Sequence, residues 1–402
     1  MVAAVTKFSA GQSILRKLGA PLLLGGLLSG LLGGSAFVLA TVLPEERVDL
    51  LYHRYDGGGL EVDGTSVLVR KNFADKVSVS ANHFIDNVSS ASIDVVTQAS
   101  AFEDKRTEKS FSVDYLFDRT LMSAGYIQSD ESDYLSKTYH FDVSQDFFGD
   151  LTTFSMGYTR GNNTIKSNSN KTFEEESLHQ EYRVGLSQII TRNLIMSVTQ
   201  ELMVDDGYLS NPYRSYRYAT STANAANGIY SWQIERFPSA RTSHTTGVHA
   251  RFHLPNYRAA IYGNYRYYTD GWDVKSNTFE LGYNHTLPSG WLFDVHARSY
   301  KQSAANFYSD LYISTLSNAF DYQTRDKQLS DMQSVAFGVG VTYELPFKDI
   351  FIDKLTFNLM WDRIKFDFNN FRDASVKNVG AGTEPEYSYD ADVLRMLLTV
   401  WY

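Results

Sequence analysis

Histidine, arginine and aspartate recur at every second position in two segments, a spacing that places them on one face of a β-strand. Imidazole with carboxylate is a common ligand set for transition metals and also carries protons. The same side chains can instead brace one another, because a buried charge needs a partner of opposite sign. The sequence leaves both interpretations open. The seven candidate residues are His249, Arg251, His253, Arg266, Asp294, His296 and Arg298.

Polar and apolar residues alternate along the segments that carry these candidates. In residues 247–254 one face is apolar, with Val248 and Phe252, and the other holds the two histidines. We expect residues 294–298 two strands further on, with residues 262–266 on the strand between. The alternation recurs at 278–287, 334–345 and 355–361. It is typical of strands that separate water from an apolar environment, but a soluble sandwich shows it too.

The end of the chain distinguishes the two classes better. Apolar residues occupy every second position there and the last of them is a C-terminal aromatic, which is typical of bacterial outer-membrane barrels. We therefore predict that these residues form the signal read by the barrel-assembly machinery. They are Leu394, Met396, Leu398, Val400 and Tyr402.

The start of the chain resembles a secretory signal peptide. Lys7, Arg16 and Lys17 precede an apolar stretch, Leu18–Ala40, that ends on small residues. Its 23 residues are also long enough for a membrane anchor, but no basic cluster follows it. We expect residues 1–40 to be cleaved as a signal peptide and residues 41–402 to form one domain. Because three basic and no acidic side chains leave with the peptide, the formal net charge changes from −9 to −12.

The lengths of the connections predict the architecture. If the C-terminus lies in the periplasm, the short connections near residues 74, 118, 148, 192, 255, 289 and 350 fall at that end. The long ones, at 88–109, 160–178, 205–241, 304–332 and 367–389, fall at the other, which is typical of outer-membrane barrels. The prediction is all-β: one antiparallel transmembrane barrel of about 16 strands in the bacterial outer membrane. If residues 47–71 form a plug rather than the first hairpin, the count is 14.

Composition excludes several functions. The chain has no cysteine, which rules out disulfides, thiolate metal sites and a cysteine nucleophile. Its acidic balance gives no electrostatic basis for binding nucleic acid. No nucleotide loop, zinc motif or nucleophile elbow is present. We therefore expect neither an enzyme nor a cofactor. The expected partners are outer-membrane lipid, the assembly machinery and a periplasmic or surface protein.

One outer segment, residues 207–218, is rich in tyrosine, asparagine and arginine. Such a loop suits contact with a ligand or partner, and it equally suits packing against the rim of a barrel. Both interpretations stay open.

Several segments resemble a domain-of-unknown-function family of Gram-negative outer-membrane barrels. They are YHRYDGGG at 52–59, the segments 77–100, 192–197, 207–214 and 304–310, and the terminal VWY. The resemblance implies the barrel fold but no activity and no catalytic residue. It also implies genes nearby for a flavin transferase, a thioredoxin-like protein and a small lipoprotein, and hence a role beside an extracytoplasmic redox system. The chain itself has no haem-attachment motif and no cysteine for such chemistry.

Three functions follow from these observations. The first is a porin-like channel for small solutes or ions, with an acidic balance that favours cations. The second is a plugged barrel that serves as scaffold or partner for the redox system. The third is a histidine-lined barrel that binds or takes up metal.

Overall fold

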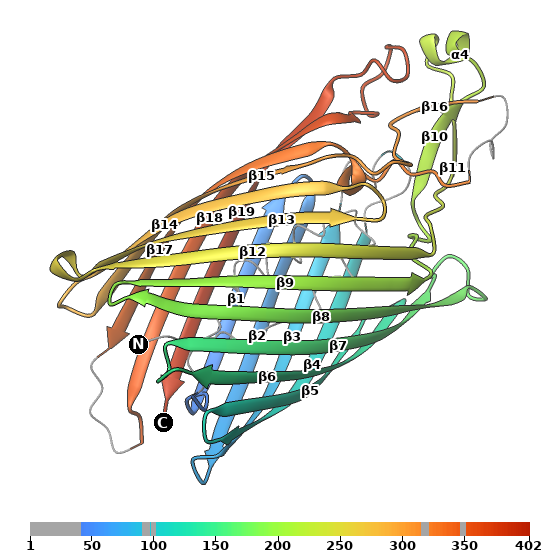
Figure 1. The fold of residues 1–402 in the computed structure, drawn as a ribbon. Coiled ribbons are helices and arrows are strands. Elements are labelled where there is room, and N and C mark those ends of the chain that lie inside the picture. Colours follow the sequence, from blue (N-terminus) through green and yellow to red (C-terminus); the bar gives the residue numbers. More distant parts are fainter. Residues whose placement is uncertain (1–41, 91–96, 98–101, 315–320, 346–350) are drawn as a thin grey trace.

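The computed structural model describes residues 42–90, 97, 102–314, 321–345 and 351–402. Sixteen strands form one closed antiparallel barrel, which confirms the predicted fold class (Figure 1). Each strand pairs with its neighbours along the chain except where a loop carries extra strands, so that β9 pairs with β12 and β15 with β17. The predicted signal peptide, residues 1–40, lies outside the described residues.

The strands of the wall are 11 to 19 residues long. The first eight are β1 (Arg47–Gly57), β2 (Leu60–Phe73), β3 (Val77–Ser90), β4 (Phe102–Phe117), β5 (Thr120–Asp130), β6 (Tyr134–Phe147), β7 (Thr152–Lys166) and β8 (Glu174–Thr191). The second eight are β9 (Leu194–Gly207), β12 (Ala240–Leu254), β13 (Ala259–Asp270), β14 (Lys275–Thr286), β15 (Trp291–Gln302), β17 (Met332–Leu345), β18 (Lys354–Arg372) and β19 (Glu386–Trp401).

The first hairpin belongs to the wall and is not a plug. β1 pairs with β19 from Arg47 opposite Trp401 to Gly57 opposite Ala391, which closes the barrel. Its other edge pairs with β2 through a two-residue turn, Gly58 and Gly59, both with positive φ. Such a turn matches the twist of paired strands and favours glycine at both positions. The count is therefore sixteen strands, and the alternative of fourteen is wrong.

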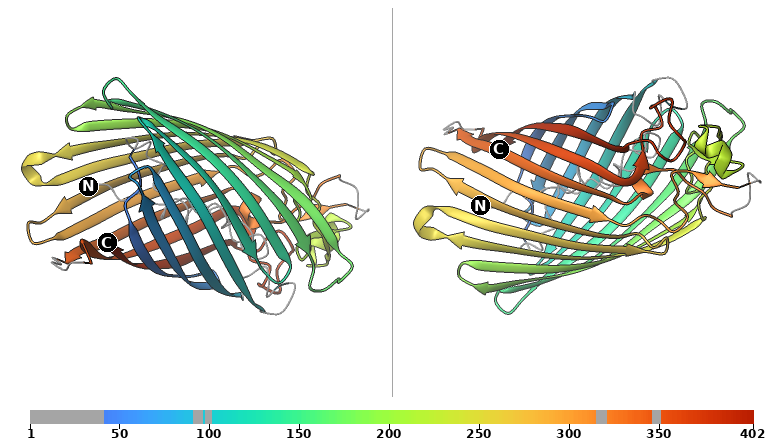
Figure 2. Two further views of the ribbon diagram at one scale, coloured as in Figure 1. Left: turned by 90° about the horizontal axis from the view of Figure 1, so that it is seen from below. Right: turned by 90° about the horizontal axis from the view of Figure 1, so that it is seen from above.

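The two ends of the barrel differ as predicted. The long connections all lie at the end opposite the C-terminus (Figure 2). That end also has short turns after β1, β5 and β13, and those after β5 and β13 were expected as exceptions. The predicted loop boundaries were wrong in three places. β3 extends to Ser90 and β4 begins at Phe102, β7 and β8 extend to Lys166 and from Glu174, and β18 and β19 extend to Arg372 and from Glu386. In all three hairpins the backbone continues to pair beyond the apolar part of the strands.

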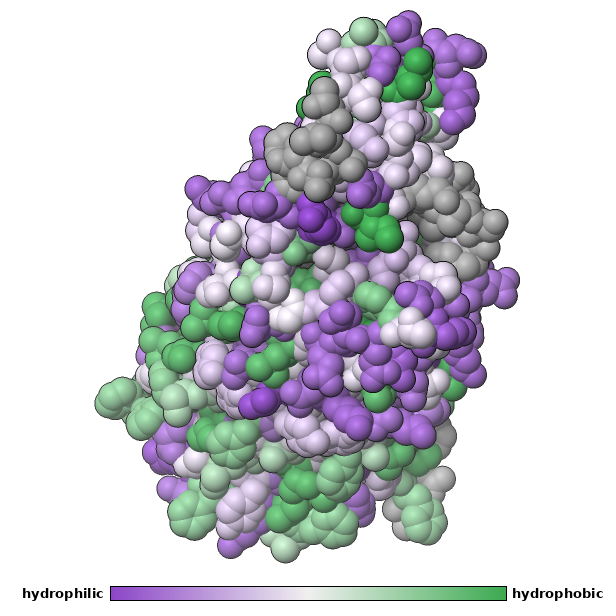
Figure 3. All heavy atoms as spheres, turned by 90° about the vertical axis from the view of Figure 1, so that its right-hand side faces the viewer, coloured by the Kyte–Doolittle hydropathy of each residue, from purple (hydrophilic) through white to green (hydrophobic). Residues whose placement is uncertain are grey.

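The outward face of the barrel is apolar. Exposed side chains such as Phe141, Leu281, Val335 and Phe337 alternate with inward polar ones. In Figure 3 hydrophobic residues gather towards the bottom of the view, and the top is mostly hydrophilic. A closed wall satisfies every strand's hydrogen bonds, so an apolar exterior over such a wall is suited to a bilayer. The protein is an outer-membrane barrel of the kind found in Gram-negative bacteria.

A small folded unit stands above the end with the long loops. Its sheet consists of β11 (Ser231–Ile234), β10 (Ser215–Ala219) and β16 (Tyr312–Ile313), in that order, beside the short helix α4 (Thr222–Ala226). We call residues 208–239, 303–314, 321–331 and 373–385 the outer platform. The described residues also form two single-turn helices, η1 (Pro255–Tyr257) and η2 (Lys327–Leu329). None of the helices that the structure describes has the length and apolar character needed to cross a membrane.

The terminal aromatic contacts the barrel seam, and this contact generates a prediction. The Tyr402 hydroxyl donates to the Arg70 carbonyl at 2.9 Å, and the Lys71 ammonium lies 4.9 Å from the Tyr402 ring. We expect Tyr402→Ala to assemble severalfold more slowly, whereas Tyr402→Phe, which keeps the ring, should assemble like the parent. The measurement is the appearance of the heat-modifiable folded band on unboiled gels over time. An unchanged rate for Tyr402→Ala would contradict an assembly role for Tyr402.

Candidate functional site

The seven predicted candidates lie on lumen-facing positions of β12, β13 and β15. On each strand the neighbouring residues are exposed on the outer face, for example Phe252, Ile261 and Val295. One expectation about their spacing was wrong. β14 as well as β13 lies between β12 and β15, so the two histidine-bearing segments are three strands apart and not two.

Side chains of β13 and β14 connect the two segments. His249 Nδ1 donates to the Asn264 side chain, and Asn264 Nδ2 donates to Glu280 Oε1 at 3.0 Å. Arg251 Nη2 donates to Asn284 Oδ1 at 3.0 Å, and Asn284 in turn donates to Asp294. The candidates are therefore joined through asparagine. Arg298 and His253 also face the lumen, but among the described residues no hydrogen bond joins them to this chain of bonds.

Among the candidates, His296 has a carboxylate partner at each of its two ring nitrogens. Its Nδ1 lies 2.9 Å from Asp294 Oδ1 and its Nε2 lies 2.8 Å from Asp362 Oδ1. The other oxygen of Asp362 accepts from Arg395 Nη2 at 2.9 Å. Both ring nitrogens therefore face carboxylates, an arrangement that a protonated imidazole satisfies with two N–H donors. Sequence reasoning missed Asp362 and Arg395, which come from strands more than sixty residues away.

A second buried group on the far side of the seam was missed entirely. His53 Nε2 lies 3.0 Å from Asp86 Oδ1, and the His53 ring stacks on Phe84 at 5.3 Å. Arg106 lies 3.7 Å from Asp86 Oδ2, pairs with the fully buried Glu108 and donates to Ser129 Oγ at 2.9 Å. Alternation places each of these residues inward, but no sequence signal shows that they meet.

Glycine makes these contacts possible. His53 and Asp86 stand on β1 and β3, opposite Gly64 on the strand between them. Gly338 lies in the same way between His296 and Asp362. A Cβ atom at either glycine would overlap both polar side chains. Gly157 holds the corresponding place between Asp142 and Arg183. Lumen-facing residues thus reach over a glycine to partners two strands away.

This geometry does not favour the metal interpretation. The structure describes one group of three side chains close enough to share an ion, and it consists of Asp104, Glu131 and Asp133 at the outer rim. None of the seven candidates belongs to it. Both nitrogens of His296 already face carboxylates, and His249 Nδ1 is bonded to Asn264.

The lumen has a packed side and a water-exposed side. Inward residues of β1–β3 and β17–β19 form an apolar cluster, in which Phe366 and Phe371 are fully buried. Tyr308 of the outer platform packs against this cluster and its hydroxyl donates to the Asn370 carbonyl at 3.1 Å. On the opposite wall Arg266 pairs with Glu201 at 3.3 Å, and their side chains are 48% and 21% exposed although both face the lumen. Water therefore reaches the β6–β14 side.

A buried ionic cluster holds the outer platform together. The Arg217 guanidinium, 0% exposed, donates to Glu384 Oε1 at 2.5 Å and to Oε2 at 3.0 Å, and it pairs with Asp310. Asp310 also accepts from Arg325 Nε at 3.0 Å and from the Arg372 backbone N–H at 3.1 Å. Three loops far apart in sequence thus meet at Asp310. Within residues 207–218 these contacts support the packing interpretation for Arg217.

The pKa values of two buried acids in the outer platform are shifted in opposite directions. Burial opposes the charge of Glu384, but the hydrogen bonds from Arg217 outweigh it and hold the pKa of Glu384 below its ordinary value. Glu235 is buried with weaker compensation: Arg214 lies 3.6 Å from its Oε2, and burial raises the pKa of Glu235 to about 7. Glu384 is therefore ionised at neutral pH, whereas Glu235 titrates there.

The lumen-facing glycines yield a stability prediction. Gly338→Ala should destabilise the folded barrel by about 1–3 kcal/mol, because the added methyl group overpacks against His296 and Asp362. Gly263→Ala is the matched control, since that position faces outward and a Cβ there meets only the Glu280 carbonyl at 3.8 Å. Urea titration of protein folded in lipid vesicles measures both. Equal stability of the two variants would contradict the spatial role of Gly338.

The Glu235 carboxyl yields a pH prediction. Because its pKa is raised in the folded protein, the protonated form persists up to about 7 and is lost as pH rises through that value. The stability that this group contributes is fully present below its ordinary pKa of 4.5 and declines as pH rises from there to about 7. Infrared spectra of the parent should show protonated carboxyl absorbance that decreases within about one unit of pH 7. Glu235→Gln should reduce this change by the contribution of one carboxyl, and an unchanged amplitude in that variant would assign the titration to other groups.

Comparisons with known proteins identify the family of this chain. A comparison with curated protein sequences found no match. Solved structures are similar only at low identity. A bacterial polysaccharide outer-membrane secretin is 8% identical, with 89% of this chain and 99% of that one covered and a TM-score of 0.46. OmpT, an outer-membrane protein of Vibrio cholerae, is 9% identical over 89% and 98%, with a TM-score of 0.41. OccK1 of Pseudomonas aeruginosa is 8% identical over 89% and 97%, with a TM-score of 0.42.

The family match covers most of the barrel. Residues 97–359 match the model of a family described as protein of unknown function (DUF3570). The match begins before β4 and ends within β18, so it includes the water-exposed wall and two of the three loops that meet at Asp310. The chain belongs to the DUF3570 family of outer-membrane β-barrels.

Proposed function

We propose that the protein is a channel that passes small ions and hydrophilic solutes along the β6–β14 side of its lumen. The observation that carries this proposal is the exposure of charged side chains that point inward. Arg266 and Glu201 face away from the lipid yet remain in contact with water. Asp142 on β6 and Glu181 on β8, both close to Arg183, also face the lumen, and Arg183 lies directly opposite Glu201 in the sheet.

The packed side of the lumen narrows this path. The apolar cluster of β1–β3 and β17–β19 occupies one wall near the outer end, and the outer platform covers part of it through Tyr308. What is left for solutes is lined by arginine and carboxylate pairs. Close pairs of opposite charge nearly cancel, so the parent channel is expected to select weakly between cations and anions.

A second candidate is a closed barrel that acts as a scaffold for a partner protein. The observations that favour it are the same apolar cluster and the folded outer platform, which stands beyond the rim (Figure 1). The two functions predict different conductance. If purified, folded protein gives no single-channel events in planar bilayers across a range of salts, the channel proposal fails and the scaffold is favoured.

Charge substitutions in the lumen test the channel directly. Arg266→Gln leaves Glu201 without its cationic partner, so the reversal potential in a salt gradient should shift towards cation selectivity. Glu201→Gln leaves Arg266 unbalanced, so the shift should have the opposite sign. The measurement is the zero-current potential of single channels under tenfold salt gradients.

The control is Arg363→Gln on the outer face, where Arg363 pairs with Asp390 at 2.9 Å and with Asp392. This variant should keep the parent's reversal potential. Shifts of the same sign in both lumen variants, or no shift in either, would show that permeating ions do not pass close to Arg266 and Glu201.

A further inference from the structure

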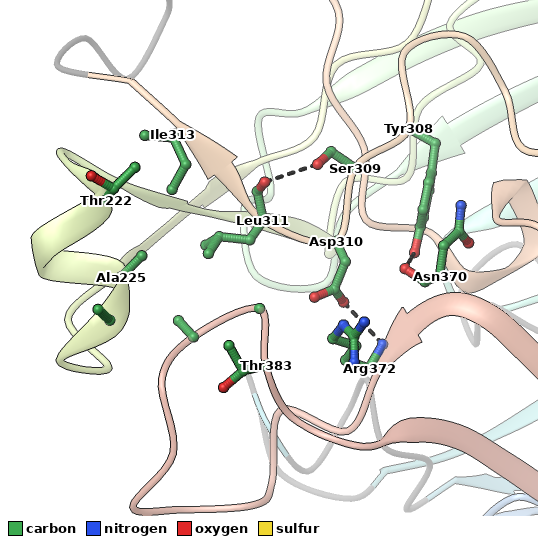
Figure 4. A pocket seen from close by; sticks show the side chains of 13 residues that line it. Thr222, Ala225, Tyr308, Ser309, Asp310, Leu311, Ile313, Asn370, Arg372 and Thr383 are labelled. Carbon is green, nitrogen blue, oxygen red and sulfur yellow. Dashed lines mark hydrogen bonds between the residues drawn. The ribbon is translucent and has the colours of Figure 1, made fainter.

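A pocket of about 580 Å³ lies within the outer platform, outside the lumen (Figure 4). Its walls come from α4, from the segment leading into β16, from the end of β18 and from the loop before β19. This volume is in the range of sites that hold small molecules. Residues that line it include Ala225, Ser309, Leu311, Ile313, Arg372 and Thr383.

Hydrogen bonds fix these walls to one another. The Ala381 N–H donates to the Ala225 carbonyl at 2.8 Å, which joins the last loop to α4. The Ser309 N–H donates to the Thr324 carbonyl at 3.1 Å, and the Gly382 N–H donates to Glu384 Oε2 at 2.8 Å. The pocket is therefore a built feature of the platform, and it rests on the buried ionic cluster around Asp310.

The charges of that cluster do not balance at the pocket. Two buried carboxylates, Asp310 and Glu384, are shared by the guanidinium groups of Arg217 and Arg325. Arg372 adds a third guanidinium, which is partly exposed and lines the pocket. Its Nη1 donates to the Glu384 carbonyl at 2.6 Å, and no carboxylate of the described residues lies within ion-pair distance of its side chain. One positive charge thus remains available in the pocket.

The remaining lining includes Asn370 and Asp310, whose carboxylate is paired with Arg217 and Arg325, and is otherwise mostly apolar with a few hydroxyl groups. Ala225, Leu311 and Ile313 supply apolar surface, and Ser309 and Thr383 already donate their hydroxyls to the Leu311 and Gly380 carbonyls. Such hydroxyls can only accept further hydrogen bonds. A ligand that satisfies this site carries one anionic group for the guanidinium and an apolar body for the opposite wall.

We propose that this pocket binds a small organic acid with a single carboxylate and an apolar body, with Arg372 as the residue that pairs with the carboxylate. A multiply charged anion without an apolar part, such as inorganic phosphate, meets one guanidinium there and no other free cation of the described lining. The site lies in the outer platform, so it does not depend on whether the barrel conducts.

The test is isothermal titration calorimetry with the full-length folded barrel in detergent. Benzoate is the probe, benzyl alcohol is its neutral counterpart and inorganic phosphate is the anion without an apolar part. We expect the parent to bind benzoate saturably and the other two at least about tenfold more weakly. Arg372→Gln should lose about tenfold or more of the benzoate affinity, because the charge-assisted hydrogen bonds are removed.

Arg160→Gln is the matched control, since Arg160 is an exposed arginine on β7 with no ion pair and lies outside the pocket. It should bind benzoate like the parent. Thr222→Trp, which places a large ring at the pocket wall without touching the ionic cluster, should also weaken binding and covers the case in which Arg372→Gln does not fold. Equal benzoate affinity in parent, Arg372→Gln and Thr222→Trp, or no saturable binding to the parent, would overturn the proposal. Tighter phosphate than benzoate binding would overturn the ligand class.

Discussion

The pairing of inward charges across an intervening glycine is the constraint on which the rest of this barrel depends. A wall that faces lipid on one side must place its charges on the other, and those charges must find partners there. Some of them bond to a direct neighbour in the sheet, as His249 does to Asn264. Gly64, Gly157 and Gly338 each leave a gap over which residues two strands apart can meet. The same device serves both the buried histidine pairs and the more exposed Arg183–Asp142 pair.

The consequence for function is an uneven lumen. Where glycine-bridged pairs adjoin apolar inward residues, as around His53 and Asp362, the wall is dry and acts as a support. Where charged pairs stand among other charges, as around Arg266, the lumen-facing side chains stay exposed, and this is the side along which we propose that solutes pass. A barrel of sixteen strands is wide enough for both. The shape of the lumen is thus determined by which inward positions are apolar, and not by the number of strands alone.

The sequence predicted the fold better than the site. Alternation, the terminal aromatic and the order of short and long connections were sufficient for sixteen strands, because each depends on residues close together in the chain. Candidates such as His296 were correctly placed on lumen-facing positions for the same reason. Their partners could not be predicted, since Asp362 meets His296 only through the register of β15, β17 and β18. The spacing between residues 249–253 and 294–298 was miscounted by one strand, although residues 278–287 were themselves predicted as a strand. The extra sheet of the outer platform pairs segments almost a hundred residues apart, which local patterns do not show.

The convergence of three loops on Asp310 also sets an order of events during assembly. Arg217 comes from the connection between β9 and β12, Arg325 from that between β15 and β17, and Glu384 from that between β18 and β19. The last of these connections exists only when the final hairpin has been added to the sheet. Without Glu384 the buried guanidinium of Arg217 lacks one of its two carboxylate partners. The cluster is therefore complete only once the connection between β18 and β19 has formed.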